Sequence, residues 1–208
     1  MTTGGEGGML TTNRRDVWEK AWAFKDHGKD FQCVFEHMHE PGFRWLHQSF
    51  GTNWRMTEMQ AAIGRVALRK VPAWVLKRRR HAALMTAFLH QIPGIRTTEP
   101  PANCFHAYYK YYCFIYPELL QCGVTRDQIM SMINAAGVPC YSGSCSEIYR
   151  EQAFVRAGLH PAERHPVARE LGETSLMFLV HPTLTSAHIV RTCEVVAEVM
   201  SEVARRLQ

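Results

Sequence analysis

Apolar residues recur at helical spacing over two long stretches of the chain. The first runs from Thr57 to about Gln91 and the second from Ser186 to Leu207, and each places its apolar side chains on one stripe. Thr57 with Gln60 three residues later is typical of a capping box, so we expect the first helix to begin there. Pro72 lies inside this pattern and predicts a kink or a break.

The first fifty residues carry weaker patterns. A glycine-rich stretch at 4–8 is followed by an apolar segment, so we expect a turn and then a short strand over Met9–Thr12. Asn13 and Asp16 are both candidate N-caps for the helix that comes next. Residues 30–51 are aromatic, rich in histidine and aperiodic, which predicts an ordered loop.

After Pro100 the chain alternates between strand patterns and helix patterns. We expect strands over 108–116, 138–142 and 175–180, and helices over 125–136, 147–157 and 166–172. Thr125 is the expected N-cap of the helix over 125–136. The order strand, helix, strand, helices, strand, helix indicates a small α/β domain with helices laid on a sheet.

Composition and charge exclude several classes of protein. The chain has 208 residues, 46% apolar and 21% charged, which is typical of a globular protein. No apolar run is long enough to span a bilayer, and the N-terminal residues lack a signal-peptide pattern, so we expect a cytoplasmic protein with no membrane partner. Seven scattered cysteines without a CxxC pair argue against a disulfide framework. Cys33 with His37 and His39 matches no zinc spacing, so we expect no metal.

The run Lys77-Arg78-Arg79-Arg80-His81 has two interpretations. It could bind phosphates of a nucleic acid, or it could be a solvated part of the long helix. Five consecutive residues spread around most of a helix, and no aromatic residues interleave with these charges. The net charge of +5 is also mild. We therefore favour a solvated face and expect no nucleic-acid partner.

Two candidate binding motifs lie in the first sixty residues. The segment 51–56, which contains Asn53 and Arg55, directly precedes the long helix. An amide, a forked guanidinium and a helix N-terminus together could grip an anion. A loop with a surface arginine is an equally open interpretation. Gly4 and Gly5 could let the backbone approach a ligand closely, although a turning or frayed terminus explains them as well.

Two further candidates follow strands in the second half. The loop Tyr141-Ser142-Gly143-Ser144-Cys145-Ser146-Glu147 offers hydroxyls and a thiol that could line a pocket of the size of a sugar. The alternative is a turn in which Ser146 caps the next helix. His181 follows the strand that ends at Val180, where α/β folds often place a crevice, although a lone histidine is more often structural.

The order and spacing of these motifs resemble the DegT/StrS family of sugar aminotransferases. Residues 51–64 read GTNWRMTEMQAAIG and resemble the family block G-x-N-Y-R-M-x-E-x-Q-A-A-I-G. Residues 1–13 resemble the stretch that follows the Schiff-base lysine. The resemblance covers essentially the whole chain and implies an α/β protein of the fold-type-I class. It implies the C-terminal portion only: the end of the large cofactor domain over 1–70 and a small α/β domain over 71–208.

The resemblance also implies a chemistry and its partners. Members carry pyridoxal 5′-phosphate (PLP), and they transfer an amino group from glutamate or glutamine to a keto sugar attached to a nucleotide. They are usually homodimers with shared active sites. By resemblance, Asn53 reaches the cofactor phosphate of the partner subunit, Arg55 lies near the substrate or phosphates, and Gly4 and Gly5 shape the turn behind the lysine. The implied substrate-binding residues are Tyr141, Ser142, Ser144, Cys145 and His181.

Two departures from the family pattern matter. Residues 142–148 read SGSCSEI where many members have an aromatic-Pro-Leu-His pattern, which predicts a different sugar preference. The Schiff-base lysine would lie one or two residues before Met1, and Lys20 and Lys25 on the following helix do not replace it. We therefore expect a fragment that is inactive alone.

A fragment of this kind would leave part of its large-domain surface uncovered. The aromatic residues expected to lose their cover are Trp18, Trp22, Phe24, Phe31, Phe35, Phe43 and Trp45. A large exposed apolar surface of this kind predicts association. The alternative function is accordingly a non-catalytic fragment that pairs with a full-length paralogue or with a separately encoded N-terminal half.

Overall fold

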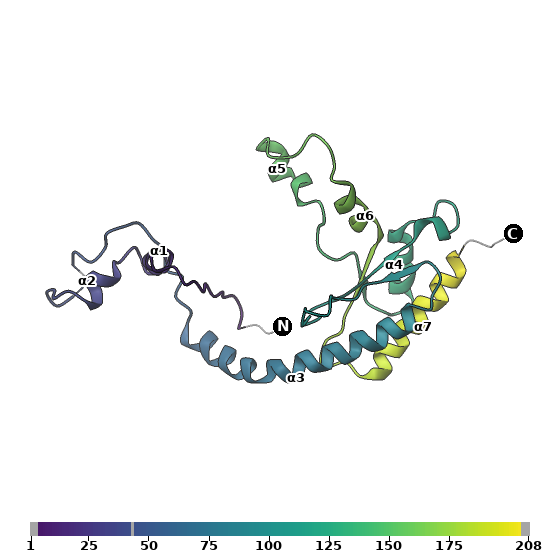
Figure 1. Cartoon of the computed structure of the whole chain (residues 1–208), viewed down its shortest axis with the longest axis horizontal. Coiled ribbons are helices and arrows are strands. Elements are labelled where there is room, and N and C mark those ends of the chain that lie inside the picture. The colour runs from purple at the N-terminus through teal and green to yellow at the C-terminus, as the bar shows by residue number, and fades with distance from the viewer. Residues whose placement is uncertain (1–3, 43, 205–208) are drawn as a thin grey trace. The chain divides into compact units, whose positions relative to one another are not determined.

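The computed structural model describes residues 4–42 and 44–204 (Figure 1). Its internal contacts divide the chain into two units, residues 2–71 and a unit that begins at Pro72. Helix α3 (Glu58–Leu89) crosses this division and continues through Pro72, so the break expected there does not occur. A proline removes only one backbone N–H, and the other residues of the helix keep theirs. Among the described residues, no helix is long and apolar enough to cross a membrane.

The first unit contains α1 (Arg15–Lys25), α2 (Phe31–Phe35) and the start of α3. The loop expected over 30–51 therefore holds a short helix, which Asp30 caps by accepting from the Cys33 N–H at 2.9 Å. Thr57 and Gln60 form the expected capping box of α3, since each side chain accepts from the other's backbone N–H.

Two expectations for the first unit are wrong. Residues 9–12 form no strand, because no neighbouring segment pairs with them among the described residues. Arg14, and neither Asn13 nor Asp16, is the N-cap of α1. The carboxylate of Asp16 instead pairs with the Arg14 guanidinium at 2.6 Å, which removes it from the capping role.

The described part of the first unit buries few apolar side chains. Within residues 4–42 and 44–71, only Leu46 and Ala67 are buried hydrophobic residues. Edge-to-face contacts join its aromatic rings at centroid distances of 4.8 Å for Trp18 and Phe31 and 5.2 Å for Phe24 and Trp54. The exposed large apolar residues include Trp18, Phe24, Phe35 and Trp45, as expected, and Trp22 and Phe31 are half-buried. Phe43 lies outside the described residues.

The second unit is built on a four-stranded antiparallel sheet of order β1-β2-β4-β3. The strands are β1 (Ile95–Thr97), β2 (Tyr111–Ile115), β3 (Cys140–Tyr141) and β4 (Ser175–Phe178). Strands β2, β3 and β4 lie inside the expected segments and are shorter than predicted. Strand β1 was not predicted, because three residues are too few to show a period.

The helices of the second unit follow the expected order. They are α4 (Arg126–Ala135), α5 (Gln152–Arg156), α6 (Pro166–Thr174) and α7 (Ser186–Val203), with 3-10 turns η1 (Pro117–Leu119) and η2 (Ile148–Arg150). Thr125 caps α4, as predicted, and forms a full capping box with Gln128. The helix expected over 147–157 is divided into η2 and α5. Both belong, with α6, to the long connection between β3 and β4 (Figure 1).

One face of this sheet is covered by helices and forms the core. Alternate residues of β2 and β4, such as Cys113 and Phe178, are fully buried against α4, α7 and the C-terminal half of α3. The apolar stripe of α7 is buried as predicted, and its members include Ile189, Cys193, Val196, Val199, Met200 and Val203. On the opposite face, Tyr112, Met177 and Tyr141 form a row across three strands. That row carries the candidate substrate site.

Candidate functional site

The hydroxyl-rich loop after β3 is tied to β4 at its start. The Ser175 hydroxyl donates to the Ser142 carbonyl at 2.7 Å. Arg126, the first residue of α4, donates from its guanidinium to the Ser175 carbonyl at 2.8 Å. Ser175 is buried, so these bonds are shielded from water. The start of the loop therefore takes its position from the sheet and from α4.

The Tyr112 side chain contacts the next two residues of the loop, Gly143 and Ser144. Gly143 has φ +88°, and a Cβ at this position would come within 2.3 Å of the Tyr112 ring. The Ser144 N–H donates to the Tyr112 hydroxyl at 3.2 Å. Only glycine allows both this backbone conformation and the close approach of the ring. The Tyr112 side chain on β2 therefore fixes the position of the Ser144 backbone relative to the sheet.

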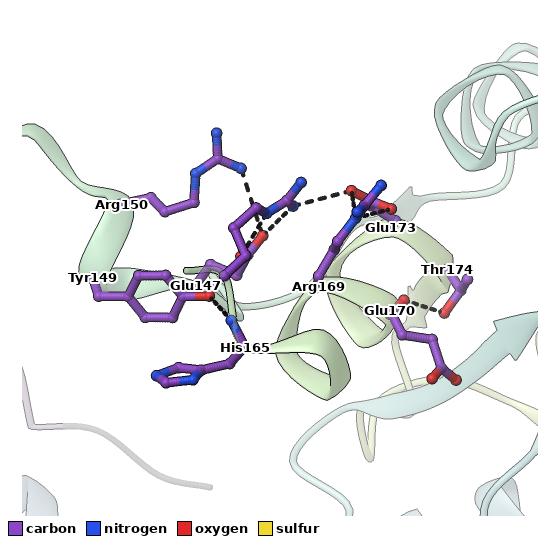
Figure 2. A network of polar contacts seen from close by, with 9 residues as sticks. Glu147, Tyr149, Arg150, His165, Arg169, Glu170, Glu173 and Thr174 are labelled. Carbon is purple, nitrogen blue, oxygen red and sulfur yellow. Dashed lines mark hydrogen bonds and ion pairs between the residues drawn. The ribbon is translucent and has the colours of Figure 1, made fainter. Parts of the chain in front are cut away.

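Glu147 anchors the far end of the loop through a polar network (Figure 2). Its carboxylate accepts from Arg164 Nε at 2.9 Å and from the Tyr149 hydroxyl at 2.6 Å. Arg150 lies 3.7 Å from the same carboxylate. The Tyr149 hydroxyl also accepts from the His165 N–H at 2.9 Å. The network continues into α6, where Glu173 pairs with Arg164 and Arg169.

These partners fix the charge of Glu147. Hydrogen bonds from Arg164 and then from Tyr149 lower the pKa of its carboxyl to about 2. The same carboxylate raises the pKa of Arg164. Glu147 is therefore an anion with its oxygens already occupied at neutral pH, which makes it a structural anchor rather than a proton donor.

A pocket of about 660 Å³ lies between this loop, η2 and α6. It brings together three of the predicted substrate-binding residues, Ser142, Ser144 and Cys145. The other described residues around it include Arg126, Arg150 and Glu151. Hydroxyls and charged groups of both signs suit a polyhydroxylated ligand better than an apolar one. Tyr141 and His181 do not line this pocket.

His181 belongs to a different part of the second unit. Its Nδ1 lies 2.8 Å from the Thr183 hydroxyl, in the turn after β4. Burial and then the positive charge of Arg78 lower the pKa of His181, so the neutral ring is favoured. Among the described residues, this geometry shows a turn-forming histidine and no acid or base partner for it.

The basic run of α3 is not the solvated face that we expected. Arg78 and His81 are each 3% exposed, and the Arg78 guanidinium donates to the Tyr109 carbonyl at 3.0 Å. The helix turns these two side chains toward the sheet because the same face carries buried Ala82 and Met85. Of the remaining members, Lys77 and Arg80 are exposed and Arg79 is half-buried.

The first unit holds the predicted anion-binding pair. Arg55 Nε donates to the Asn53 amide oxygen at 3.2 Å, and Asp26 lies 3.7 Å from the Arg55 guanidinium. A backbone bridge between Asp26 and Asn53 fixes this arrangement at the end of α1. Burial would raise the pKa of Asp26, but the charges of Lys29, Arg55 and Lys25 outweigh it and lower that pKa. Asp26 is thus an anion that orients Arg55.

The glycine turn lies against the start of α3. A Cβ on Gly4 would come within 3.1 Å of the Gln60 carbonyl, and Gly5 has φ +93°. The Gln60 amide also donates to the Glu6 carbonyl at 2.8 Å. The glycines therefore serve a close approach between this turn and α3, in the same unit as Asn53 and Arg55.

Sequence reasoning missed the residues that hold the hydroxyl-rich loop in place. No motif points to Tyr112 or Arg164, and the sequence identifies Glu147 only as the last residue of the candidate loop and the start of an expected helix. Ser146 does not cap a helix, because η2 begins at Ile148 with Glu147 in the cap position and no side-chain cap bond. The partners of Glu147 and Ser144 lie 17 and 32 residues away along the chain, and no local pattern signals such pairs.

Comparisons with known proteins place the chain in a family. The sequence profile of the DegT/DnrJ/EryC1/StrS aminotransferase family matches residues 1–197. A crystal structure of an aminotransferase from Psychrobacter cryohalolentis is 48% identical with a TM-score of 0.89, over 98% of this chain and 53% of that one. GDP-perosamine synthase of Caulobacter vibrioides is 27% identical over 95% of this chain and 49% of its own length.

The fold is shared with more distant enzymes. The E. coli GDP-4-keto-6-deoxy-D-mannose-3-dehydratase, solved with bound hydrated PLP, has a TM-score of 0.73 at 18% identity. The match covers 89% of this chain and 48% of that one. The chain thus spans about half the length of the relatives it matches.

Proposed function

We propose that the chain, which belongs to the DegT/DnrJ/EryC1/StrS aminotransferase family, is the C-terminal portion of a PLP-dependent sugar aminotransferase. The reaction would move an amino group from glutamate or glutamine to a nucleotide-linked keto sugar. The observation that carries this proposal is the hydroxyl-rich loop after β3, which is held at three points beside a pocket lined by hydroxyls and charged groups. Such a surface suits the hydroxyl groups of a sugar.

We assign the two units to the two domains of such an enzyme. Residues 1–70 would complete the large cofactor domain, and residues 71–208 would form the small domain. The division of internal contacts at Pro72 supports this assignment. The poor burial in the first unit supports it as well, because a partial domain lacks the surface that would cover its apolar side chains.

The donors of the first unit fit the phosphate of PLP. The Asn53 amide oxygen is occupied by Arg55, which orients the amide nitrogen as a donor. Arg55 is exposed and adds a positive charge. When bound, PLP supplies an electron sink for the carbon that carries the amino group. Asn53 and Arg55 would hold its phosphate across a homodimer interface, while Gly4 and Gly5 set the turn beside them.

The residues of the second unit would bind the sugar. Ser142, Ser144 and Cys145 would face its hydroxyls, Tyr141 would extend this wall, and His181 would shape the backbone after β4. We propose that the lysine which carries PLP and moves the proton lies before Met1, so that residues 1–208 alone are inactive. The setting we propose is the cytoplasm, where thiols such as the free, exposed Cys145 stay reduced.

The test begins with the coding sequence upstream of Met1. We expect an open frame that encodes a lysine one or two residues before Met1 and roughly another domain of protein. The longer product should bind PLP and should convert a nucleotide-linked keto sugar to the amino sugar with glutamate, as followed by mass spectrometry. The 208-residue chain should show no lysine adduct with PLP after borohydride reduction.

Variants of the longer product separate binding from folding. Asn53→Ala should weaken PLP binding on the order of tenfold, because one donor to a charged phosphate is lost. Asn13→Ala is the matched control, since Asn13 is exposed and outside the candidate site. A longer product that binds PLP but aminates no nucleotide-linked keto sugar would contradict the proposed reaction. A PLP–lysine adduct on the 208-residue chain would contradict its proposed inactivity.

The exposed aromatic side chains favour a second candidate function. The 208-residue chain would then be a non-catalytic subunit that pairs with a full-length paralogue or a separately encoded N-terminal half. A stop codon directly upstream of Met1 would favour this candidate. Co-production with such a partner should give a stable complex by size exclusion, and a well-folded monomer that ignores both partners would count against it.

A further inference from the structure

His27 has a backbone conformation that is uncommon for residues other than glycine. It lies just after the end of α1, and its φ is +62°. Its N–H donates to the Thr52 carbonyl at 3.1 Å. The neighbouring residues Asp26 and Asn53 form a backbone bridge between the same two segments. The conformation of His27 is therefore set by the segment that carries the predicted anion-binding pair.

Close backbone contacts hold this turn in place. The Gly28 N–H donates to the Ala23 carbonyl at 2.7 Å. A Cβ on Gly28 would come within 1.7 Å of the Ser49 carbonyl oxygen, and a Cβ on Gly51 would come within 2.9 Å of the His27 carbonyl carbon. Unfavourable backbone conformations persist where the surrounding structure fixes them, and they are concentrated at functional sites. The conformation of His27 thus points to a role for its side chain.

The imidazole of His27 lies against the guanidinium of Arg55. Its Nε2 is 3.5 Å from Arg55 Nη2. An arginine side chain has no acceptor, so the imidazole nitrogen is the acceptor in this contact. Arg55 Nε donates to the Asn53 amide oxygen at 3.2 Å, and Arg55 Nη1 lies 3.7 Å from Asp26 Oδ1. Each nitrogen of the guanidinium therefore faces a different acceptor.

Asp26 does not fix the orientation of Arg55 alone. Its carboxylate is shared with Lys29 at 3.5 Å and with Lys25 at 3.8 Å. A carboxylate shared by three cations attracts the Arg55 charge without setting the direction of its N–H groups. The contacts of Asn53 with Nε and of His27 with Nη2 supply that direction, because they act on two separate nitrogens.

These contacts leave part of the Arg55 guanidinium open to a ligand. A guanidinium has five N–H groups, and three of those of Arg55 face Asn53, His27 and Asp26. Within the part of the chain that the structure describes, the guanidinium has no further partner, so one N–H remains on each terminal nitrogen. The side chain is 49% exposed. Two such N–H groups match two oxygens of one phosphate.

We propose that His27 is a positioning residue for Arg55, and that its imidazole keeps the two open N–H groups turned toward a phosphate. The neutral imidazole accepts from Nη2 while the Asn53 amide oxygen accepts from Nε, so the guanidinium has one orientation. Without the imidazole, the charge of Arg55 remains but its guanidinium is free to rotate. The assignment rests on the proposed function, in which Asn53 and Arg55 hold the phosphate of PLP.

Nuclear magnetic resonance of the full, isotope-labelled 208-residue chain tests the contact itself. The buffer is mildly alkaline, because a protonated imidazole accepts no hydrogen bond. We expect the His27 tautomer that carries its proton on Nδ1. His27→Leu and His27→Gly should each shift the Arg55 Nε–H signal and speed its exchange with water. His37→Leu is the matched control, since His37 is exposed in the same unit and outside the candidate site.

Titration of the same chain with inorganic phosphate tests the consequence for binding. The Arg55 Nε–H signal should respond to phosphate in a saturable way, and potassium chloride at equal ionic strength should not reproduce this response. His27→Leu and His27→Gly should weaken phosphate binding on the order of tenfold, because a hydrogen bond to a charged group is lost. His27→Gln should restore most of the affinity, because its amide oxygen can accept from Arg55 in place of the imidazole.

The glycine variant separates the lost contact from a loss of folding. Glycine adopts a φ of +62° without strain, so His27→Gly should keep the fold even if His27→Leu does not. Circular dichroism of each variant checks this. His27→Leu and His27→Gln lack glycine's backbone freedom alike, so a difference between them reports the acceptor.

A proton on Nε2 of His27, or an Arg55 signal that His27→Gly leaves unchanged, would overturn the contact. Equal phosphate affinity of the wild-type chain and His27→Gly would overturn the positioning role, and so would a wild-type chain that does not respond to phosphate. PLP binding and amination by the longer product test the proposed function separately, because neither requires His27 to be the residue that orients Arg55.

Discussion

Arg164 holds both carboxylate oxygens of Glu147, from 17 residues further along the chain. The pair joins the hydroxyl-rich loop to the segment that leads into α6, and Arg164 continues to Glu173 on α6 itself at 3.0 Å. A two-point contact of this kind fixes orientation as well as distance. The geometry of the loop thus depends on a residue outside it.

Loss of the Glu147 charge should destabilise the protein in a pH-dependent way. The folded-state pKa of about 2 lies below the ordinary value of 4.5, so the carboxylate contributes stability above pH 4.5 and loses it as the pH falls toward 2. Glu147→Gln should lower the melting temperature at pH 7. The difference from wild type should shrink between pH 4.5 and pH 2, as followed by circular dichroism. Glu163→Gln, at an exposed position in the same segment, should show no such trend.

Alanine at position 143 should be more costly than alanine at another left-handed glycine. Gly143→Ala combines a φ of +88° with a contact of 2.3 Å to the Tyr112 ring. Gly123→Ala has φ +84° and no atom within 4 Å of its added Cβ, so it carries the backbone cost alone, about 1 kcal/mol. Urea unfolding should show the larger loss for Gly143→Ala. Equal losses would mean that the Tyr112 ring moves aside freely.

Truncation of Ile129 should test the core between α4 and the sheet. Its side chain is fully buried, so Ile129→Ala should reduce the free energy of unfolding by about 2–5 kcal/mol. Val167→Ala removes apolar atoms from a side chain that is 65% exposed, and it should change the free energy little. Denaturant unfolding of both variants measures the difference. A small loss at Ile129 would indicate a core that collapses around the missing atoms.

The aromatic surface of the first unit should drive association. Phe35, Trp45 and Phe50 are 65%, 90% and 101% exposed. Replacing the three with serine should reduce concentration-dependent self-association in sedimentation velocity, because exposed apolar area favours contact between molecules. Phe105→Ser with Leu159→Ser removes exposed apolar area from the second unit and is the matched control. An equal reduction in both variants would show that the first unit has no special role.

Signals confined to a few neighbouring residues were read correctly from the sequence. The capping box at Thr57, the N-cap at Thr125 and the stripe of α7 were predicted because each depends on spacings of three or four residues. Family membership was also recognised, through the block around Asn53.

Contacts between segments that are distant along the chain could not be predicted from such local patterns. Strand β1 exists because Ile95–Thr97 pairs with β2 across a long connection, and residues 9–12 are not a strand because no segment that the structure describes pairs with them. Arg78 was expected in solvent because its own helix does not reveal the surface against which it packs. The hydrogen bonds from Arg164 to Glu147 could not be predicted either, because the two residues lie 17 positions apart in the sequence.

By itself, the sequence determined most of the helices, the caps at Thr57 and Thr125 and the family, since these depend on local propensity and motif spacing. It did not determine α2, the N-cap of α1 or strand β1. The tertiary structure alone decided that Gly143 must be a glycine, that Arg78 is buried, and which side chains hold the hydroxyl-rich loop. Those outcomes depend on what the chain brings close in space, and van der Waals contact and desolvation act only at that range.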